Sequence, residues 1–228
     1  MKKFFFKGIK KNLNLLIDKF LVKKNKSETN FLLNRHLRLT YGDQKGQVEY
    51  LINNVLNYEK NGLYKNGFFV DLACGDGKEI NNTFFLEKYL NWKGLLFEPN
   101  PKFKKKIKKN RTSILITKCI TDKENQKVNF RVDNSLLGGI VSADTDNNYS
   151  NRESELRNAE IISIETTTLE KELIENNAPN IIDYLSLDIE GAEWLALKNF
   201  SFDKYKFRCI SIERPNFDLD LLLEKEGY

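Results

Sequence analysis

Histidine is nearly absent from this chain, and cysteine is scarce. His36 is the only histidine, which excludes a metal site built from several histidines and argues against a hydrolase with a serine, histidine and aspartate triad. The three cysteines, Cys74, Cys119 and Cys209, lie far apart and show no CxxC spacing. We therefore expect free thiols in a reducing compartment, which predicts a cytoplasmic protein.

The sequence also has no long apolar run, and its positive charge is concentrated at one end. No stretch approaches the ~18 apolar residues of a membrane-spanning helix, and lysines interrupt the early apolar run, so no signal peptide is expected. The net charge is +5, but residues 1–26 hold nine lysines and one acid, which puts +8 there and −3 on the remainder. The body of the chain thus lacks the basic stripe of a nucleic-acid-binding domain, and no such partner is expected.

The basic start of the chain has helical periodicity. Apolar residues recur there at helical spacing among the lysines: Phe5, Ile9, Leu13, Leu16 and Phe20. A basic amphipathic helix of this kind is typical of segments that lie on anionic membranes, which predicts peripheral membrane contact. Packing against its own domain or a partner is the alternative. We assign residues 1–40 to this helix and a linker, and residues 41–228 to a second domain.

From Tyr41 onward, strand and helix patterns alternate. Strands are predicted at residues 67–73, 93–98, 112–119, 128–132, 161–167, 181–189 and 207–213, with a polar loop at 144–157. Helices are predicted at residues 48–62, 82–92, 101–110, 168–177, 193–200 and 217–227. Runs such as FFV, LLF and ILI are apolar on both faces of their strands, as in a buried parallel sheet. The pattern predicts an α/β fold with a mostly parallel sheet and helices on both faces.

The stretch FFVDLACGDGKEI, residues 68–80, ends a buried strand with Asp71 and continues with glycines. Ligands of an open parallel sheet bind beyond the carboxyl ends of its strands, and Gly75 and Gly77 permit a sharp turn and close approach to a ligand. They fit the first two places of GxGxxG, but Ile80 takes the third, and nearby acids would repel a diphosphate. S-adenosylmethionine, which has a positive end and no phosphate, suits this loop better than NAD.

Glu98 ends the next predicted strand and is followed by Pro-Asn-Pro. A carboxylate at this position can accept hydrogen bonds from both hydroxyls of a ribose. NAD-binding sheets use an acid in a similar way. Glu98 alone therefore does not choose between the two cofactors.

Acidic residues also follow two later strands. LSLDIEGAEW places Asp188, Glu190 and Glu193 at the end of a strand and in the next helix, and Glu213 ends the strand FRCISIE. Clustered carboxylates raise one another's pKa, which suits a general base acting on an acceptor hydroxyl. Mg²⁺ prefers oxygen ligands and is the alternative use of these acids. Alternatively, Glu190 and Glu193 only cap the following helix, where acids are favoured.

Taken together, these motifs resemble the FkbM family of S-adenosylmethionine-dependent methyltransferases. The likeness is carried by FFVDLACGDG, NTFFLEKYLNWKGLLFEPNP, TTTLEKELIENNAPNIIDYLSLDIEGAEWLAL and ISIE, and it spans roughly residues 41–228. The resemblance implies the seven-stranded, Rossmann-like class I methyltransferase fold. It also implies methylation of a hydroxyl group on a glycan, a lipid-linked sugar or a small metabolite.

The resemblance also implies roles for individual residues. Asp71, Gly75 and Gly77 would line the methionine end of the cofactor, and Glu98 would hold its ribose. Thr121 or Asp122, after the third strand, would lie where such enzymes bind adenine. The family often has glycine at the position of Ala73, whose methyl group is expected to narrow the cofactor loop.

The end of the chain carries a further expectation. In the family that the sequence resembles, the glycine and aromatic at Gly227 and Tyr228 lead into a final antiparallel hairpin. We expect this hairpin to be missing, which would leave residues 208–213 as an exposed edge prone to association.

Two other functions remain open from the sequence. One is a non-catalytic protein of the same fold that binds a partner through its basic amino-terminal helix. The other is an NAD-binding enzyme, which the missing third glycine disfavours.

Overall fold

The computed structural model describes residues 46–57, 65–133 and 136–228. The chain forms two compact units, one of residues 1–67 and 78–93 and the other of residues 68–77 and 94–228. The predicted basic helix, its linker and His36 lie outside the described residues, and so does the predicted domain start at Tyr41. Among the described residues, no helix combines the length and the apolar character needed to cross a membrane.

The first unit contains short helical segments. These are α3 (Gln47–Tyr50), the π-helical turn η1 (Leu51–Val55) and α5 (Phe84–Leu90). The single helix predicted for residues 48–62 is interrupted, because Asn57 has a left-handed φ of 49°, a conformation that asparagine tolerates better than most residues. Gly62, its predicted end, lies outside the described residues. Just before α5, whose N-cap position is Thr83, Asn81 Oδ1 accepts the N–H groups of Thr83 and Phe84 at 3.0 and 2.7 Å.

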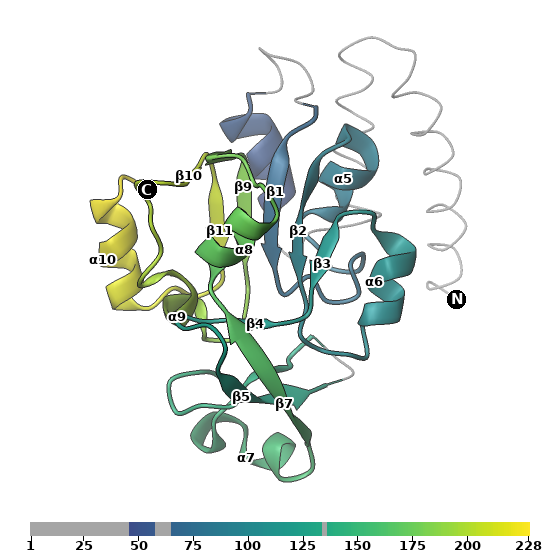
Figure 1. Ribbon diagram of the computed structural model, residues 1–228, viewed down its shortest axis with the longest axis vertical. Coiled ribbons are helices and arrows are strands. Elements are labelled where there is room, and N and C mark those ends of the chain that lie inside the picture. Colours follow the sequence, from purple (N-terminus) through teal and green to yellow (C-terminus); the bar gives the residue numbers. More distant parts are fainter. Residues whose placement is uncertain (1–45, 58–64, 134–135) are drawn as a thin grey trace. The chain divides into compact units, whose positions relative to one another are not determined.

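A five-stranded sheet forms the centre of the second unit (Figure 1). Its strands are β1 (Phe68–Leu72), β2 (Lys93–Phe97), β3 (Ile114–Ile116), β9 (Tyr184–Leu187) and β11 (Ile210–Ile212). Their order is β11-β9-β1-β2-β3, and the pairs β1–β9, β9–β11 and β2–β3 are parallel. The chain builds outward from β1 to β3 and then returns to the other side of β1. The point where the order reverses therefore lies between β1 and β9, where ligands of such sheets bind.

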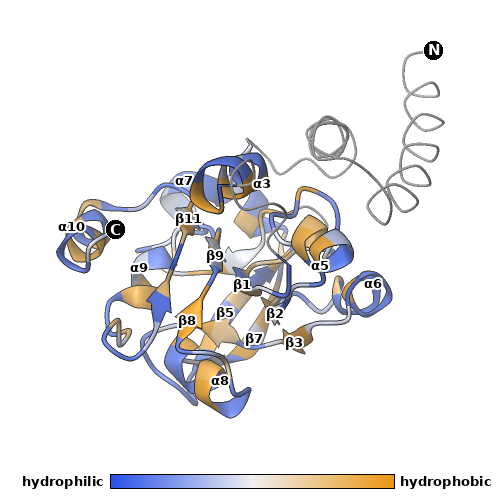
Figure 2. Ribbon diagram, turned by 90° about the horizontal axis from the view of Figure 1, so that it is seen from above, coloured by the Kyte–Doolittle hydropathy of each residue, from blue (hydrophilic) through white to orange (hydrophobic). Residues whose placement is uncertain are grey.

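Helices contact both faces of this sheet. They are α6 (Lys104–Asn110), α8 (Leu169–Glu175), α9 (Glu193–Leu197) and α10 (Phe217–Lys225). One core cluster joins Val70 and Leu185 of the strands with apolar residues of α8, α9 and α10, such as Leu173. On the opposite face, Arg111 at the end of α6 lies over the ring of Phe69, 5.3 Å from its centroid. Figure 2 shows the apolar strands as orange ribbons between these helices. The α/β prediction with a mainly parallel sheet is confirmed.

The two predicted strands that contain β9 and β11 are each broken into two. The run 181–189 gives β8 (Ile181–Ile182) and β9, and the run 207–213 gives β10 (Lys206–Phe207) and β11. β8 and β10 pair with each other in a separate two-stranded sheet. Asp183 explains the break, because its Oδ2 accepts the N–H of Phe68 at 2.8 Å and its Oδ1 lies 3.1 Å from Arg208 Nε.

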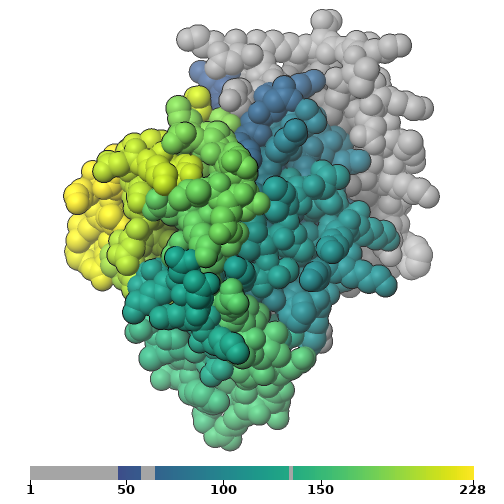
Figure 3. All heavy atoms as spheres, viewed as in Figure 1, coloured from purple at the N-terminus to yellow at the C-terminus, as the bar shows by residue number. Residues whose placement is uncertain are grey.

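A second sheet is inserted between β3 and α8. It has the order β4-β7-β5-β6, from β4 (Cys119–Ile120), β5 (Lys127–Val132), β6 (Gly139–Ile140) and β7 (Glu160–Thr167). β4 and β7 are parallel, with Ile120 opposite Thr167, and the other pairs are antiparallel. The polar run predicted as a loop at 144–157 instead includes helix α7 (Tyr149–Arg157). In Figure 3 the atoms of this insertion, teal to green, pack together as one continuous part.

Candidate active site

The glycine loop begins directly at the end of β1. The N–H groups of Ala73 and Cys74 both donate to the carbonyl of Phe97 at 2.9 and 3.1 Å, which turns the chain sharply out of the sheet. Gly75 and Gly77 then take left-handed φ angles of 56° and 78°, which glycine adopts without steric cost. Asp71, two residues before the turn, is buried on β1 opposite Ser186 of β9. The predicted loop therefore forms at the carboxyl end of β1.

Glu98 ties this loop to the second strand. One of its carboxylate oxygens accepts the N–H of Gly75 and the other accepts the N–H of Asn100, both at 2.9 Å. Burial raises the pKa of Glu98 to about 8, although both backbone hydrogen bonds act to lower it. A carboxylate has about four lone-pair sites, so each oxygen keeps one for a further donor. Two neighbouring hydroxyls of a ribose fit that remaining capacity.

Helix α6 supports the loop from the side, through residues that the sequence analysis missed. Asn110 Nδ2 donates to the carbonyl of Asp76 at 3.0 Å, and Arg111 donates to the carbonyl of Gly77 at 3.2 Å. A Cβ on Gly77 would lie 2.9 Å from Arg111 Cγ, and one on Gly75 would lie 2.6 Å from Leu136 Cδ2. Both glycines thus allow close approach of the chain to itself, whereas the sequence suggested approach to a ligand.

The predicted adenine-side residues occupy a different place from the one expected. The run 112–119 divides into β3 and β4, and Thr121 and Asp122 follow β4 of the inserted sheet instead of β3. The reason is that β4 pairs with β7, which takes the chain out of the parallel sheet. Thr121 Oγ1 donates to the carbonyl of Lys123 at 2.8 Å, and Asp122 forms an ion pair with Lys198 at 3.0 Å. Their predicted contact with adenine stays a prediction.

Asp188, Glu190 and Glu213 come together at the ends of β9 and β11. Asp188 N donates to the carbonyl of Leu72 at 3.4 Å, and Glu213 N donates to that of Leu187 at 3.0 Å, so both acids extend the register of the parallel sheet. A carboxylate oxygen from each of the three acids lies within 4.8 Å of the others. Because Leu72 precedes Ala73, the acid cluster lies beside the start of the glycine loop.

The environment of the cluster favours one proton on Asp188. Burial raises the pKa of Asp188 to about 8, and a hydrogen bond with Glu213 and repulsion from that and the other nearby acids act in the same direction. Burial also raises the pKa of Glu190, while its ion pair with Arg152 opposes the shift. Repulsion between carboxylates this close keeps a proton on Asp188 to a higher pH than an isolated aspartate would hold it.

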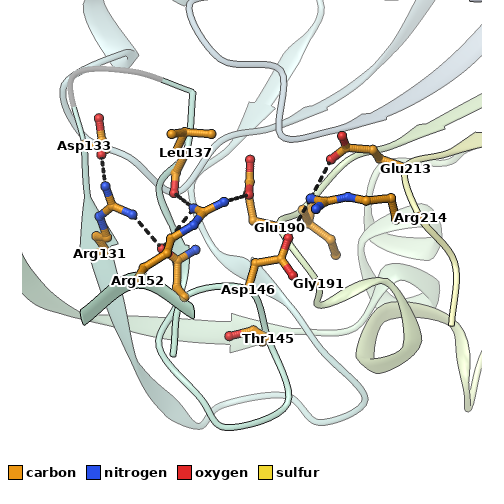
Figure 4. A network of polar contacts seen from close by, with 12 residues as sticks. Arg131, Asp133, Leu137, Thr145, Asp146, Arg152, Glu190, Gly191, Glu213 and Arg214 are labelled. Atoms are coloured by element: carbon orange, nitrogen blue, oxygen red, sulfur yellow. Dashed lines mark hydrogen bonds and ion pairs between the residues drawn. The ribbon is translucent and has the colours of Figure 1, made fainter. Parts of the chain in front are cut away.

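Two arginines form ion pairs with two acids of the cluster (Figure 4). Arg152 donates to Glu190 Oε2 at 2.7 Å and to the carbonyl of Leu137 at 2.8 Å. Arg214 bridges Asp146 and Glu213, with distances of 2.6 and 3.2 Å. Asp188 has no ion pair with any described residue, whereas its two neighbours each have an arginine. Asp188 is thus the acid best placed to gain and lose a proton.

The family of the chain follows from comparison with known proteins. A family model described as the methyltransferase FkbM domain matches residues 62–228. The chain belongs to the FkbM methyltransferase family. Neither the curated proteins nor the solved structures gave a match. The match begins after the predicted domain start at residue 41, which stays a prediction.

Membership in the FkbM family makes this a methyltransferase domain, and S-adenosylmethionine is the methyl donor that such enzymes generally use. The described residues fit this donor. Asp71 and the acid cluster offer negative charge to a sulfonium and an ammonium group, and Glu98 keeps acceptor sites for a ribose. When bound, S-adenosylmethionine supplies an electrophilic methyl group on its sulfonium sulfur.

The inserted part of this FkbM domain contributes side chains near the acid cluster that the sequence did not indicate. Arg152 lies within α7 at a kink, with φ of −136° and ψ of 44°, and Asn147 accepts from Arg131 and Arg152 at 3.1 and 3.4 Å. Arg131 also pairs with Asp133. Asp146 N donates to the carbonyl of Glu190 at 2.9 Å. The segment carrying them is polar and lacks a helical apolar period, so no sequence signal marked them.

Glu193 has a structural role in the same loop. Its Oε1 accepts the N–H of Ile189 at 2.9 Å and that of Gly191 at 3.4 Å. Glu193 lies in the first turn of α9, but these N–H groups belong to the loop before the helix, so Glu193 holds that loop and makes no cap hydrogen bond to the helix. Glu190 does not act in that way, because its side chain turns to Arg152.

Non-glycine residues with left-handed backbone mark the ends of three adjacent strands. Ala73 follows β1 with φ of 69°, Glu190 follows β9 with φ of 58°, and Arg214 follows β11 with φ of 51°. Such conformations cost of order 1–3 kcal/mol each and concentrate at functional sites. Their coincidence at one edge of the sheet supports an active site there.

Ala73→Gly is expected to stabilise the protein by up to about 1 kcal/mol. The left-handed conformation costs alanine roughly 1–2 kcal/mol, which glycine avoids. Glycine also has more conformational freedom in the unfolded chain, and this lowers the stability of the folded state by about 0.5–1 kcal/mol. The methyl group is exposed, so little packing is lost. Urea unfolding of both proteins measures the difference.

Ala192→Gly is the matched control for that substitution. Ala192 is buried and has an ordinary φ of −94°, so glycine should destabilise there. A loss of stability in Ala73→Gly as large as in Ala192→Gly would contradict the strain argument.

Proposed function

We propose that this domain transfers the methyl group of S-adenosylmethionine to a hydroxyl group, on a glycan, a lipid-linked sugar or a small metabolite. The observation that carries the proposal is Asp188, whose pKa is raised to about 8 and which lies one residue beyond the register of β1 and β9. A hydroxyl acceptor must lose its proton during methylation. A carboxylate near its own pKa is well suited to take that proton.

The residues around Asp188 have distinct parts in this scheme. Asp188 accepts the proton of the acceptor hydroxyl, and Glu213 shares it through their hydrogen bond. Arg152 and Arg214 hold Glu190 and Glu213 in place and balance part of their charge. The segment between β6 and β7, which supplies Arg152 and Asp146, forms the acceptor side of the site in this proposal.

A divalent cation such as Mg²⁺ is a second use of the same acids. Carboxylate oxygens within 4.8 Å of one another can be drawn to one cation with small side-chain movements, since Mg²⁺ binds oxygen at about 2.0–2.1 Å. The cation would replace the shared proton of Asp188 and Glu213, and it would polarise the acceptor hydroxyl. Clustered acids have raised pKa values in either case, so activity in the presence of a chelator separates the base from the metal ligand.

The first test is binding of the donor. Titration calorimetry of the full chain should show heat of binding with S-adenosylmethionine and none with NAD, because the acidic loop lacks the third glycine that a dinucleotide needs. Tight NAD binding with no S-adenosylmethionine binding would overturn the proposal. Donor binding with no transfer to any acceptor would favour a non-catalytic protein that uses its basic amino-terminal segment.

The second test identifies the acceptor atom. The protein is incubated with methyl-labelled S-adenosylmethionine and a panel of mono- and oligosaccharides, and the labelled products are treated with mild base. Methyl ethers survive this treatment, whereas methyl esters release methanol. Base-stable label on sugar oxygen supports the proposal, and label found only as ester or on nitrogen contradicts it.

A further inference from the structure

Helix α6 carries a dense array of lysines that no part of the catalytic site uses. Five of its seven residues are lysines, and it contains no acid: Lys104, Lys105, Lys106, Lys108 and Lys109. We call these five residues the lysine face. Phe103 and Ile107 are buried on the other side of the helix, while all five lysines are exposed. Figure 2 shows α6 as a mostly blue helix.

The lysine face is not neutralised by the rest of the described chain. No lysine in it forms an ion pair with a described residue, although Lys102, just before the helix, pairs with Glu160 at 3.0 Å. Lys106 instead lies over the ring of Phe103, 5.8 Å from its centroid. Within a helix about 10 Å long, the positive charges are therefore left to solvent or to a partner.

Folding does not explain the whole of this placement. Lysines four residues apart, such as Lys104 and Lys108, repel each other along a helix. Lysines in its first turn also oppose the positive end of the helix dipole. Lys108 and Lys109 lie in the last turn, where positive charge suits the negative end of the dipole. Folding therefore accounts for those two lysines and not for the three before them, which points to a role outside the fold.

The distribution of charge favours one kind of partner. Residues 27–228 carry −3, so without the five lysines they would carry −8. A positive face on an otherwise acidic domain is attracted to an extended anionic surface, while the acidic remainder of the domain is repelled by that surface. We propose that the lysine face docks the domain on a membrane that contains anionic lipids.

The composition of the lysine face separates a membrane from other polyanions. It holds no arginine for bidentate phosphate contacts and exposes no aromatic ring on which a base could stack. Lysines act as hydrated point charges, and those near an anionic bilayer are attracted by its surface potential, about fivefold in affinity for each one. The proposal stands apart from the methyl transfer reaction, because the lysines lie outside the acid cluster and the glycine loop.

The test compares two variants of the full chain that lose the same charge. In the first, four residues of the lysine face become glutamine: Lys104, Lys105, Lys108 and Lys109. In the matched control, four exposed lysines without ion pairs to described residues become glutamine: Lys123, Lys127, Lys206 and Lys225. Residues 1–26 are intact in both variants, so their contribution cancels. Co-sedimentation uses vesicles of phosphatidylcholine and phosphatidylserine in a three-to-one ratio, at low salt.

We expect the first variant to lose roughly 600-fold in vesicle affinity, about fivefold for each of the four lysines, and the control to lose far less. Arginine at the same four positions should restore binding, which also guards against a folding defect. Equal loss in the two glutamine variants would show that net charge alone matters and would overturn the proposal. Retention of binding by the first variant, or binding to RNA and not to vesicles, would overturn it as well.

Discussion

Replacing Asp188 with asparagine is expected to lower turnover by about 10²- to 10⁴-fold, the range for loss of a general base, while binding of S-adenosylmethionine changes little. Asparagine is nearly the same size as the protonated acid, and its amide can donate to Glu213 in the same way. It cannot accept a proton from a substrate. Single-turnover rates with labelled donor, compared with the donor affinity from calorimetry, separate these two effects.

The pH profile gives an independent readout. Because the pKa of Asp188 is raised to about 8, the carboxyl group is mostly protonated at lower pH and cannot act as a base. Turnover by the wild-type protein should therefore rise with pH until about 8 and then level off. The asparagine variant should show no such rise.

Stability should change in the opposite direction to turnover. A carboxyl whose pKa is higher in the folded state than in the unfolded chain costs stability as pH rises from the unfolded pKa toward the folded one. Wild-type protein should therefore lose stability between about pH 4 and 8, and the variant should escape this loss. Thermal unfolding at alkaline pH should show a variant at least as stable as the wild type.

Glu193→Gln provides the matched control. Glu193 is a buried neighbouring acid, but it binds the N–H groups of its own loop, and glutamine keeps an oxygen for them. This variant should retain most of its turnover. Normal turnover in Asp188→Asn would contradict both the base and the metal role. Abolition of wild-type activity by a chelator, with recovery on adding Mg²⁺, would assign Asp188 to a metal site.

Glu98→Ala is expected to weaken S-adenosylmethionine binding by roughly 10- to 100-fold. The estimate corresponds to the loss of charge-assisted hydrogen bonds worth about 1.5–3 kcal/mol. The substitution also leaves the N–H groups of Gly75 and Asn100 without their acceptor, so the glycine loop should loosen. Calorimetry on the folded variant measures the affinity.

Glu98→Gln separates the two contributions. Glutamine fills the same space and can still accept one of the two backbone N–H groups, so the variant should bind more tightly than Glu98→Ala and less tightly than the wild type. Ribose hydroxyls favour the ionised carboxylate, so wild-type affinity should also increase as pH rises toward 8. Unchanged affinity in both folded variants would show that Glu98 does not hold the cofactor.

The glycine loop and Glu98 were largely predictable from the sequence, and the arginines around the acid cluster were not. Asp71, Gly75, Gly77 and Glu98 lie in strand ends and turns whose patterns are local. The ion pair from Arg152 to Glu190 joins residues 38 positions apart, and that from Arg214 to Asp146 joins residues 68 positions apart. No local pattern encodes such pairs, because they depend on how the inserted sheet meets the parallel one.

The predicted secondary structure was wrong where the pattern of apolar residues did not decide the local structure. The continuous apolar run at 181–189 predicted one strand, but Asp183 binds the backbone of Phe68 and divides it. Helix α7 has only Leu156 buried, so it lacks the apolar period by which helices are found. The apolar strands β1 and β2, whose patterns are local, lie within the predicted runs.

The pairing of β4 with β7 brings the two ends of the inserted sheet together. Ile120, where the chain leaves, is the register partner of Thr167, where it returns, and both strands run in the same direction. A segment whose ends meet in this way can be exchanged for another without moving the strands that flank it. Grafting the segment between residues 120 and 167 from a related enzyme would thus replace Arg152 and Asp146 and keep the residues of the glycine loop. Such chimaeras would test whether this segment sets the choice of acceptor.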